Sequence, residues 1–286
     1  MPKTHGNHIR KPDWLKIKLP EQQQSAEIRK YLHSNNLHTI CESGKCPNFG
    51  ECWDNGAATF MILGNICTRS CDFCNVKGGK PLPPDPEEPL KIARAVQFMK
   101  LKHAVITSVD RDDLPDGGSM MWAETIQAVR KLNPGITVET LIPDFKAKQE
   151  NLQRIINLKP EIVSHNLETV ERLTKKVRRQ NIYERSLEVL RILSDAGITT
   201  KSGIMVGLGE SDKEVFQTMD DLLEVGCCIM TIGQYLQPTP KHLAVSEYIH
   251  PDTFYHYKMT GLEKGFRFVE SAPKVRSSWH ASAHLI

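Results

Sequence analysis

Three cysteines early in the chain have the spacing of a loop that binds an iron–sulfur cluster. Cys67, Cys71 and Cys74 are separated by three and then two residues, in a polar stretch directly after the apolar run 59–63. A cubane cluster has four irons and normally takes four cysteines, so this loop leaves one iron without a cysteine ligand. An open metal position is typical of a reactive centre, as it is in catalytic zinc sites. The loop therefore predicts a cluster that takes part in chemistry.

A structural zinc site is the alternative interpretation of this loop. Zinc sites usually show paired Cys-x2-Cys or Cys/His groups at matched spacing. Here the spacing is asymmetric, no histidine follows at the distance found in zinc fingers, and Phe73 stands between the last two cysteines. These features favour an iron–sulfur cluster.

A second triplet of cysteines precedes the first. Cys41, Cys46 and Cys52 are separated by four and five residues, in a stretch whose glycines and proline form turns that let thiolates converge. Two triplets predict two clusters. The second triplet also lacks a fourth ligand nearby in sequence, so a distant residue or an exogenous ligand must complete it. A zinc site completed by water or by a histidine such as His33 or His38 is the alternative.

The elements that position these loops alternate between strands and helices. Short apolar segments rich in β-branched residues predict strands, and Trp122, Ile126 and Val129 recur at helical spacing between two of them. Such alternation predicts an α/β fold with a parallel sheet covered by helices. Periodicity alone does not separate an open doubly wound sheet from a barrel, although no Gly-x-Gly-x-x-Gly follows the first strand. The predicted strands are residues 57–63, 103–108, 136–141, 162–165, 199–206 and 229–233.

Composition places few constraints on partners. The 286 residues are 40% hydrophobic and 25% charged, as in ordinary soluble globular proteins, and the net charge of +3 is too small to argue for nucleic acid. No run of eighteen apolar residues exists, and the N-terminus lacks the apolar core of a signal peptide. We therefore predict no nucleic-acid partner, no membrane partner and a cytoplasmic location.

The first cysteine loop, Cys-x3-Cys-x-Phe-Cys after a strand, resembles the signature of the radical S-adenosylmethionine superfamily. The resemblance implies a partial, TIM-like barrel of six strand–helix units that is open on one side. It also implies that the open iron binds the amino and carboxylate groups of S-adenosylmethionine, with Phe73 near the adenine. On this basis we divide the chain into an N-terminal extension (1–56) that carries the second triplet, the partial barrel (57–240), and a C-terminal helix and tail (241–286).

The two triplets, together with the tail sequence Arg276-Ser-Ser-Trp-His-Ala281, resemble the lipoyl synthase family. In that family the second serine of the tail motif, here Ser278, completes the second 4Fe–4S cluster. Trp279 stands where tyrosine is common, which leaves open how the tail is fixed. Further stretches that match the family are residues 107–118, 164–169, 201–210 and 233–238.

The resemblance implies that two sulfur atoms are inserted at carbons 6 and 8 of an octanoyl chain on a lysine of a lipoyl carrier protein. Such C–H bonds are unactivated, so the chemistry has to come from a radical cofactor. The resemblance further implies an external electron donor, cleavage of S-adenosylmethionine to an adenosyl radical at the Cys67/Cys71/Cys74 cluster, and sulfide donation by the second cluster. A methylthiotransferase is an alternative that would carry an RNA-binding module and a stronger basic patch. A two-cluster electron-transfer protein, the third interpretation, would ligate every iron.

Several residues are predicted to bind S-adenosylmethionine. Gly203 and Gly207 resemble the glycine-containing fifth strand of the superfamily, where small residues let the backbone approach the adenine. Asn166 and Glu168 follow the fourth predicted strand and are candidates for the ribose hydroxyls, although a helix cap or a surface ion pair is the alternative role for each. The remaining predicted cofactor-binding residues are Phe73, Asn75, Gln234 and, at the methionyl end, Ser108 and Arg178.

Overall fold

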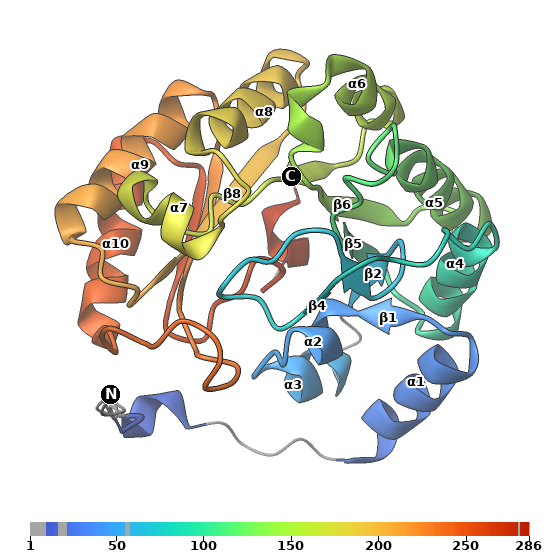
Figure 1. Cartoon of the computed structure of the whole chain (residues 1–286), viewed down its shortest axis with the longest axis horizontal. Coiled ribbons are helices and arrows are strands. Elements are labelled where there is room, and N and C mark those ends of the chain that lie inside the picture. Colours follow the sequence, from blue (N-terminus) through green and yellow to red (C-terminus); the bar gives the residue numbers. More distant parts are fainter. Residues whose placement is uncertain (1–9, 17–21, 55–57, 280, 286) are drawn as a thin grey trace.

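The computed structural model of the chain describes residues 10–16, 22–54, 58–279 and 281–285. An eight-stranded sheet curves through it in the order β1-β2-β5-β6-β7-β8-β9-β10. Figure 1 shows the strands arranged around a central space, with helices α4 to α6 and α8 to α10 forming an outer ring. This arrangement is a partial barrel, so the predicted fold class is confirmed.

The six central strands match the six predicted ones. Each pairs in parallel with its neighbour in sequence order, so every connection returns the chain to the same end of the sheet. The carboxyl ends of all six strands therefore meet at one end of the barrel. Residue 57, where the first strand was predicted to begin, lies outside the described residues. The strands are β2 Thr59–Ile62, β5 His103–Ser108, β6 Thr137–Leu141, β7 Ile162–Ser164, β8 Thr200–Val206 and β9 Ile229–Gln234.

Two edge strands were not predicted. β1 (His38–Thr39) pairs antiparallel with β2, and β10 (Phe268–Ser271) pairs in parallel with β9. Both come from the extensions on either side of the predicted barrel. A separate two-stranded sheet joins β3 (Ile66–Cys67) to β4 (Lys77–Gly78), so the cysteine loop is held between paired ends.

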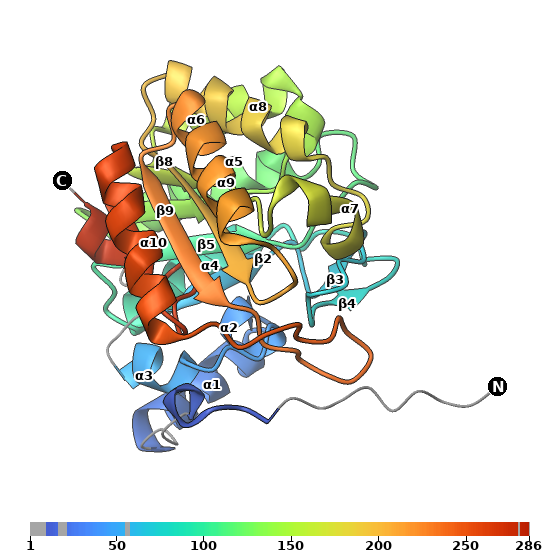
Figure 2. The same cartoon turned by 90° about the vertical axis from the view of Figure 1, so that its left-hand side faces the viewer.

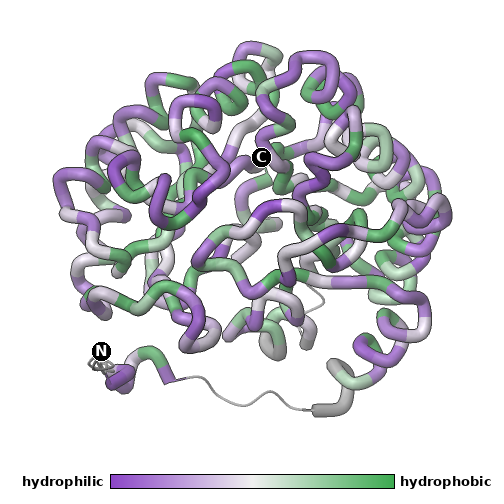
Figure 3. Tube along the Cα trace, viewed as in Figure 1, coloured by the Kyte–Doolittle hydropathy of each residue, from purple (hydrophilic) through white to green (hydrophobic). Residues whose placement is uncertain are grey.

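The main helices cover the outer face of the sheet because each has one apolar face. In α5, Trp122, Ile126 and Val129 are fully buried, which confirms this predicted helix. The tube in Figure 3 alternates between hydrophilic and hydrophobic along these helices, as such burial requires. Figure 2 shows α9 and α10 lying along β8 and β9. The helices are α4 Glu88–Phe98, α5 Ser119–Leu132, α6 Gln149–Leu158, α7 Thr174–Val177, α8 Tyr183–Asp195, α9 Asp212–Glu224 and α10 Pro251–Lys264, with short 3-10 turns η1 Asp13–Leu15, η2 Phe145–Ala147, η3 Glu171–Leu173 and η4 Ala281–His284.

The N-terminal extension packs beside the barrel as three helices, α1 (Gln22–Ser34), α2 (Ile40–Ser43) and α3 (Phe49–Asp54). Figures 1 and 2 both show them together on one side of the molecule. Tyr31 of α1 stacks on Phe98 of α4 with ring centroids 4.2 Å apart. Arg29 of α1 donates to Glu42 of α2 at 2.8 Å. The extension therefore presents its cysteines to the barrel from a fixed position.

Candidate active site

A cavity of about 330 Å³ lies at the carboxyl ends of the barrel strands. It is lined by the cysteine loop, the strand ends, the N-terminal extension and the C-terminal tail. The structure therefore brings together residues that are far apart in the sequence. The predicted site residues that line it are Cys41, Cys46, Cys67, Cys71, Phe73, Cys74, Asn75, Ser108, Asn166, Glu168, Arg178, Gly203, Gln234 and Ser278, whereas Cys52 and Gly207 do not.

The three thiols of the first cysteine loop sit in an environment that disfavours the free thiolate. Burial raises the pKa of Cys67 to about 11, and that of Cys71 and of Cys74 to about 12, although Arg178 opposes the shift at Cys71. These groups are therefore protonated near neutral pH unless a metal replaces the proton. Three thiols that share one cavity wall suit a group that binds all of them together.

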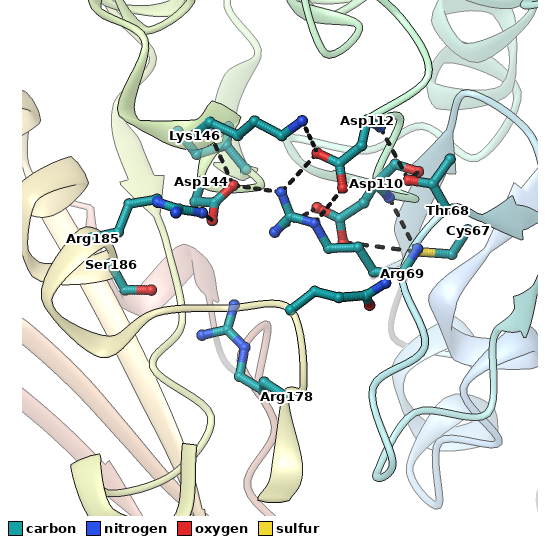
Figure 4. A network of polar contacts seen from close by, with 12 residues as sticks. Cys67, Thr68, Arg69, Asp110, Asp112, Asp144, Lys146, Arg178, Arg185 and Ser186 are labelled. Atoms are coloured by element: carbon teal, nitrogen blue, oxygen red, sulfur yellow. Dashed lines mark hydrogen bonds and ion pairs between the residues drawn. The ribbon is translucent and has the colours of Figure 1, made fainter. Parts of the chain in front are cut away.

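Arg69, which stands between Cys67 and Cys71, anchors the cysteine loop to the barrel (Figure 4). Its side chain is 3% exposed and donates to Asp112 at 2.6 and 2.9 Å and to Asp144 at 2.7 Å. Asp112 follows β5 and Asp144 follows β6, so one guanidinium joins the loop to two strand ends. These residues were not predicted from the sequence, although acidic residues a few positions after predicted strands were a visible signal.

Asp110 also belongs to this network and contacts the cysteine loop directly. Its carboxylate lies 3.7 Å from Cys67 Sγ and 3.4 Å from Arg69 Nη1. Burial raises the pKa of Asp110, while Arg69 lowers it. The Thr68 hydroxyl donates to the Asp110 carbonyl at 2.9 Å, which adds a second contact between the loop and the residues after β5.

The cavity wall formed by the strand ends carries two buried polar atoms that need a partner. Ser108 Oγ and Asn166 Oδ1 have no hydrogen-bond partner among the residues that the structure describes. Buried polar groups in proteins are nearly always hydrogen-bonded, so these atoms suit a polar ligand in the cavity. Both residues were predicted to bind S-adenosylmethionine, and the cavity therefore fits that cofactor at these two points.

Neighbouring residues hold this wall in place. Arg178 is buried and donates to the carbonyls of Asn166 and Leu167 at 2.8 and 3.1 Å. Asn166 donates to Glu168 at 3.0 Å, and burial raises the pKa of Glu168. Gly203 leaves room beside them, since a Cβ there would lie 2.3 Å from Thr231 Oγ1 and 3.3 Å from Asn166 Oδ1.

Three other predicted cofactor-binding residues make structural contacts. Gln234 donates to the carbonyls of Val206, Tyr235 and Glu247 at 3.0 to 3.2 Å and accepts from the Ile249 amide at 2.8 Å. Both ends of its amide are thereby engaged within the chain. Gly207 lies outside the cavity, with a φ of +92° in the turn after β8. Asn75 donates to the Ser43 carbonyl at 2.8 Å and joins the cysteine loop to the N-terminal extension.

The second triplet meets the C-terminal tail. A second cavity, of about 420 Å³, is lined by Cys41, Cys46, Cys52 and Ser278, and the first three of these belong to α2, α3 and the turn between them. Burial raises the pKa of Cys41 to about 11. The tail runs closely against β9, because a Cβ on Gly233 would lie 2.1 Å from the Val275 carbonyl oxygen. Ser278 of the tail lines the same cavity as the three cysteines, and its role as a ligand stays a prediction.

No three His, Cys, Asp or Glu side chains of the described residues converge closely enough to hold a single metal ion. A larger cluster, whose sulfurs and irons span the space between the thiols, suits a donor set of three cysteines in each place.

Comparison with known proteins agrees with this geometry. Residues 61–222 match the radical SAM superfamily, and residues 1–46 match the N-terminal domain of lipoyl synthase of that family. The chain is 58% identical over 279 residues to the lipoyl synthase of Phocaeicola vulgatus, covering 98% of both proteins. It is 59% identical over 276 residues to the mitochondrial lipoyl synthase of Nematostella vectensis, covering 96% of this chain and 95% of the relative.

The chain belongs to the lipoyl synthase family. Lipoyl synthases are sulfur-inserting radical S-adenosylmethionine enzymes, so the predicted enzyme class is confirmed, with S-adenosylmethionine and an iron–sulfur cluster as cofactors. The methylthiotransferase and electron-transfer alternatives have no support.

In the part of the chain that the structure describes, no helix is long and apolar enough to cross a membrane.

Solved structures share the fold of this lipoyl synthase family member. Streptococcus suis SuiB bound to S-adenosylmethionine has a TM-score of 0.59 at 10% identity, over 74% of this chain and 49% of that one. Methylornithine synthase (PylB) has a TM-score of 0.55 at 11% identity, over 90% and 81%. At these identities the likeness shows the fold alone.

Proposed function

We propose that this lipoyl synthase uses two 4Fe–4S clusters to insert sulfur at carbons 6 and 8 of an octanoyl-lysine on a lipoyl carrier protein. Cys67, Cys71 and Cys74 would hold one cluster, and Cys41, Cys46, Cys52 and Ser278 the other. The observation that carries the proposal is that the three thiols of the first triplet, Cys41 and Cys46 of the second, and Ser278 all line one cavity. A sulfur source and a radical source at one cavity would let both act on one substrate chain.

Each part of the site has a task in this scheme. Bound S-adenosylmethionine and a reduced cluster supply the one-electron chemistry that an unactivated C–H bond requires. Ser108, Asn166 and Arg178 would orient the cofactor from the barrel wall, with Phe73 beside its adenine. An octanoyl chain would lie on the apolar part of the cavity wall, which Met61, Val109, Leu141, Ile142, Met205 and Leu236 form.

Ser278 is suited to release its metal. A serine oxygen is a harder ligand than a thiolate and matches cluster iron less well. Ser278 would therefore be the most easily released ligand, while Cys41, Cys46 and Cys52 would keep hold of the cluster that supplies the sulfur. The N-terminal extension (1–56) and the tail segment (241–286) would thus build the sulfur-donating half of the site, and the barrel (57–240) the radical-generating half.

The carrier protein and the electron donor are also proposals. An octanoylated carrier, either a lipoyl domain or an H protein, would supply the substrate, and an external donor would supply electrons. The family name of the relatives supports a lipoyl product and leaves the carrier open. The cytoplasmic location stays a prediction from the sequence, since the relatives include a mitochondrial protein.

Mass spectrometry of an octanoyl-lysine peptide tests the proposal. Anaerobically reconstituted enzyme, reductant and S-adenosylmethionine should add two sulfur atoms to the peptide. Cys46→Ala should still release 5′-deoxyadenosine but add no sulfur, whereas Cys71→Ala should release none. Sulfur insertion by Cys46→Ala would contradict the role of the second cluster. The reconstituted protein should hold about eight irons, two cubanes.

A further inference from the structure

The second cysteine triplet is reached from two sides. Cys41, Cys46, Thr59, Arg276 and Ser278 line both the active-site cavity and the second cavity of about 420 Å³. Cys52 lines only the second cavity. The proposed sulfur donor therefore lies in the wall between two spaces and is not confined to the one that takes the substrate.

The two cavities lie toward opposite ends of the barrel. β5 runs between them, with Thr107 and Ser108 at its carboxyl end on the active-site cavity, and Lys102 and His103 at its amino end on the second cavity. Five residues of extended strand separate these ends by roughly 16 Å. Figure 2 shows β3, β4 and α7 together at one end of the barrel. A molecule near Lys102 would thus lie away from the strand ends that line the active-site cavity.

The second cavity carries positive charge. It is lined by Lys100, Lys102 and Arg276, and none of its described lining residues is Asp or Glu. Lys100 and Lys102 are exposed and have no ion-pair partner within the described ranges. The active-site cavity, in contrast, is lined by both signs of charge, since Asp110 and Glu168 lie there together with Lys45, Arg69, Arg178 and Arg276. A cavity lined by one sign of charge concentrates the opposite ion.

We propose that the second cavity is an anion site and passage through which hydrosulfide reaches the second triplet, where it would supply the sulfide for cluster assembly with iron that is supplied separately. The inference rests on the proposed function, in which that cluster is the sulfur source. It concerns binding and passage of the anion, so no bond is made or broken in the cavity itself. The location explains how a spent donor could be resupplied without emptying the active site of its cofactor.

Alkylation of the apoprotein with a matched pair of reagents tests the anion site. Iodoacetate and iodoacetamide have nearly the same size but differ by one negative charge, and the ratio of their rates at one thiol cancels any change in that thiol's pKa. In Lys100→Glu/Lys102→Glu the ratio at Cys52 should fall at least about fivefold, because two attractive charges become repulsive. The ratio at Cys71, which lines only the active-site cavity, should not change.

A double substitution far from the second cavity is the control for the alkylation test. Lys175→Glu/Lys176→Glu makes the same charge change at exposed positions of α7, near the other end of the barrel, and should leave the ratio at Cys52 unchanged. An unchanged ratio at Cys52 in Lys100→Glu/Lys102→Glu would overturn the anion site. Peptide mass spectrometry reads each cysteine separately, so both thiols are followed in one sample.

The rate of cluster assembly tests the passage itself. A protein with Cys67→Ala, Cys71→Ala and Cys74→Ala keeps only the second triplet, and its visible absorbance reports assembly from iron(II) and sulfide without oxygen. Adding Lys100→Glu/Lys102→Glu should slow assembly several-fold at the same final iron content. An equal rate would overturn the passage. If the parent triple variant took up no iron, the proposal that the second triplet binds a cluster would be wrong. This result differs from an equal assembly rate, so the experiment distinguishes failure of the proposed function from failure of the passage.

Discussion

The Thr59 hydroxyl donates a hydrogen bond of 2.7 Å to Ser278 Oγ, although 219 residues separate the two in sequence. Thr59 is the first residue of β2, the strand that leads into the first cysteine loop, and Ser278 belongs to the C-terminal tail. The first strand of the barrel therefore sets the position of the oxygen that we propose as a ligand of the second cluster. Ser277 is fixed similarly, by a 2.6 Å hydrogen bond from Asn166.

Ser278→Ala should separate radical formation from sulfur insertion. We expect lipoyl product to fall at least about tenfold, because a cluster without its fourth protein ligand is held less well. Release of 5′-deoxyadenosine should continue, since Cys67, Cys71 and Cys74 are unchanged. Thr59→Val removes only the hydrogen bond, worth about 1 kcal/mol, and should reduce product less. Both products are measured by mass spectrometry of one reaction, and full sulfur insertion by Ser278→Ala would refute the assignment.

Arg69→Ala should destabilise the fold strongly. Asp144 is fully buried, and without Arg69 its carboxylate keeps a hydrogen bond of 3.0 Å from the Lys146 amide and a longer contact of 3.4 Å to Arg185. Loss of one partner of a buried ion pair costs about 3 kcal/mol or more in the free energy of unfolding. Arg172→Ala is a matched control, because the Arg172–Glu214 pair is exposed and contributes at most about 1 kcal/mol. Denaturant unfolding of the apoproteins measures both, and equal losses would contradict the anchoring role.

The sequence predicted the six central strands because each is buried on both faces and therefore reads as a short apolar run. β1 was not predicted because it is two residues long and is defined by its pairing with β2. β10 has the sequence FVES, too short and too polar to stand out. Local periodicity carries no information about such long-range pairing.

The candidate site also contains some residues that could be predicted from the sequence and others that could not. The cysteine spacing predicted the metal loop directly, since its ligands are close in sequence. Ser278 could be assigned only through a family resemblance, because nothing near it in sequence marks a ligand. The network of Arg69 with Asp112 and Asp144 depends on which strand ends meet, and this follows from the sheet order rather than from spacing.

Lowering the pH should destabilise the fold, because Glu139 then becomes protonated. This carboxylate is 1% exposed and lies 2.9 Å from Lys201 Nζ. Burial alone would raise its pKa, but Lys201 and His103 outweigh burial and hold the pKa at about 2, against 4.5 for an ordinary glutamate. A lowered pKa stabilises the fold above the unfolded value, and that contribution is lost as pH falls from about 4.5 toward 2.

Glu139→Gln isolates this contribution. The free energy of unfolding of the apoprotein should fall by up to about 3 kcal/mol more between pH 5 and 2 in the parent than in Glu139→Gln. Glu161→Gln, which changes a half-exposed pair with Arg130, serves as the control and should keep the parent's pH dependence. Denaturant titrations across this range provide the measurement. Parallel pH curves for the parent and Glu139→Gln would show that the buried pair does not titrate as described.

Asn166→Ala and Ser108→Ala should weaken binding of S-adenosylmethionine. Both side chains line the active-site cavity and hold a buried polar atom without a partner in the described structure, so a bound cofactor is expected to supply the hydrogen bond. Each loss should raise the dissociation constant about tenfold, as for a hydrogen bond of about 1 to 1.5 kcal/mol. Thr169→Val is the matched control, because Thr169 Oγ1 is buried and equally without a described partner but lies outside the cavity. Calorimetry on reconstituted protein measures the three constants, and a similar loss in all three would mean that the substitutions act through the fold rather than through the cofactor.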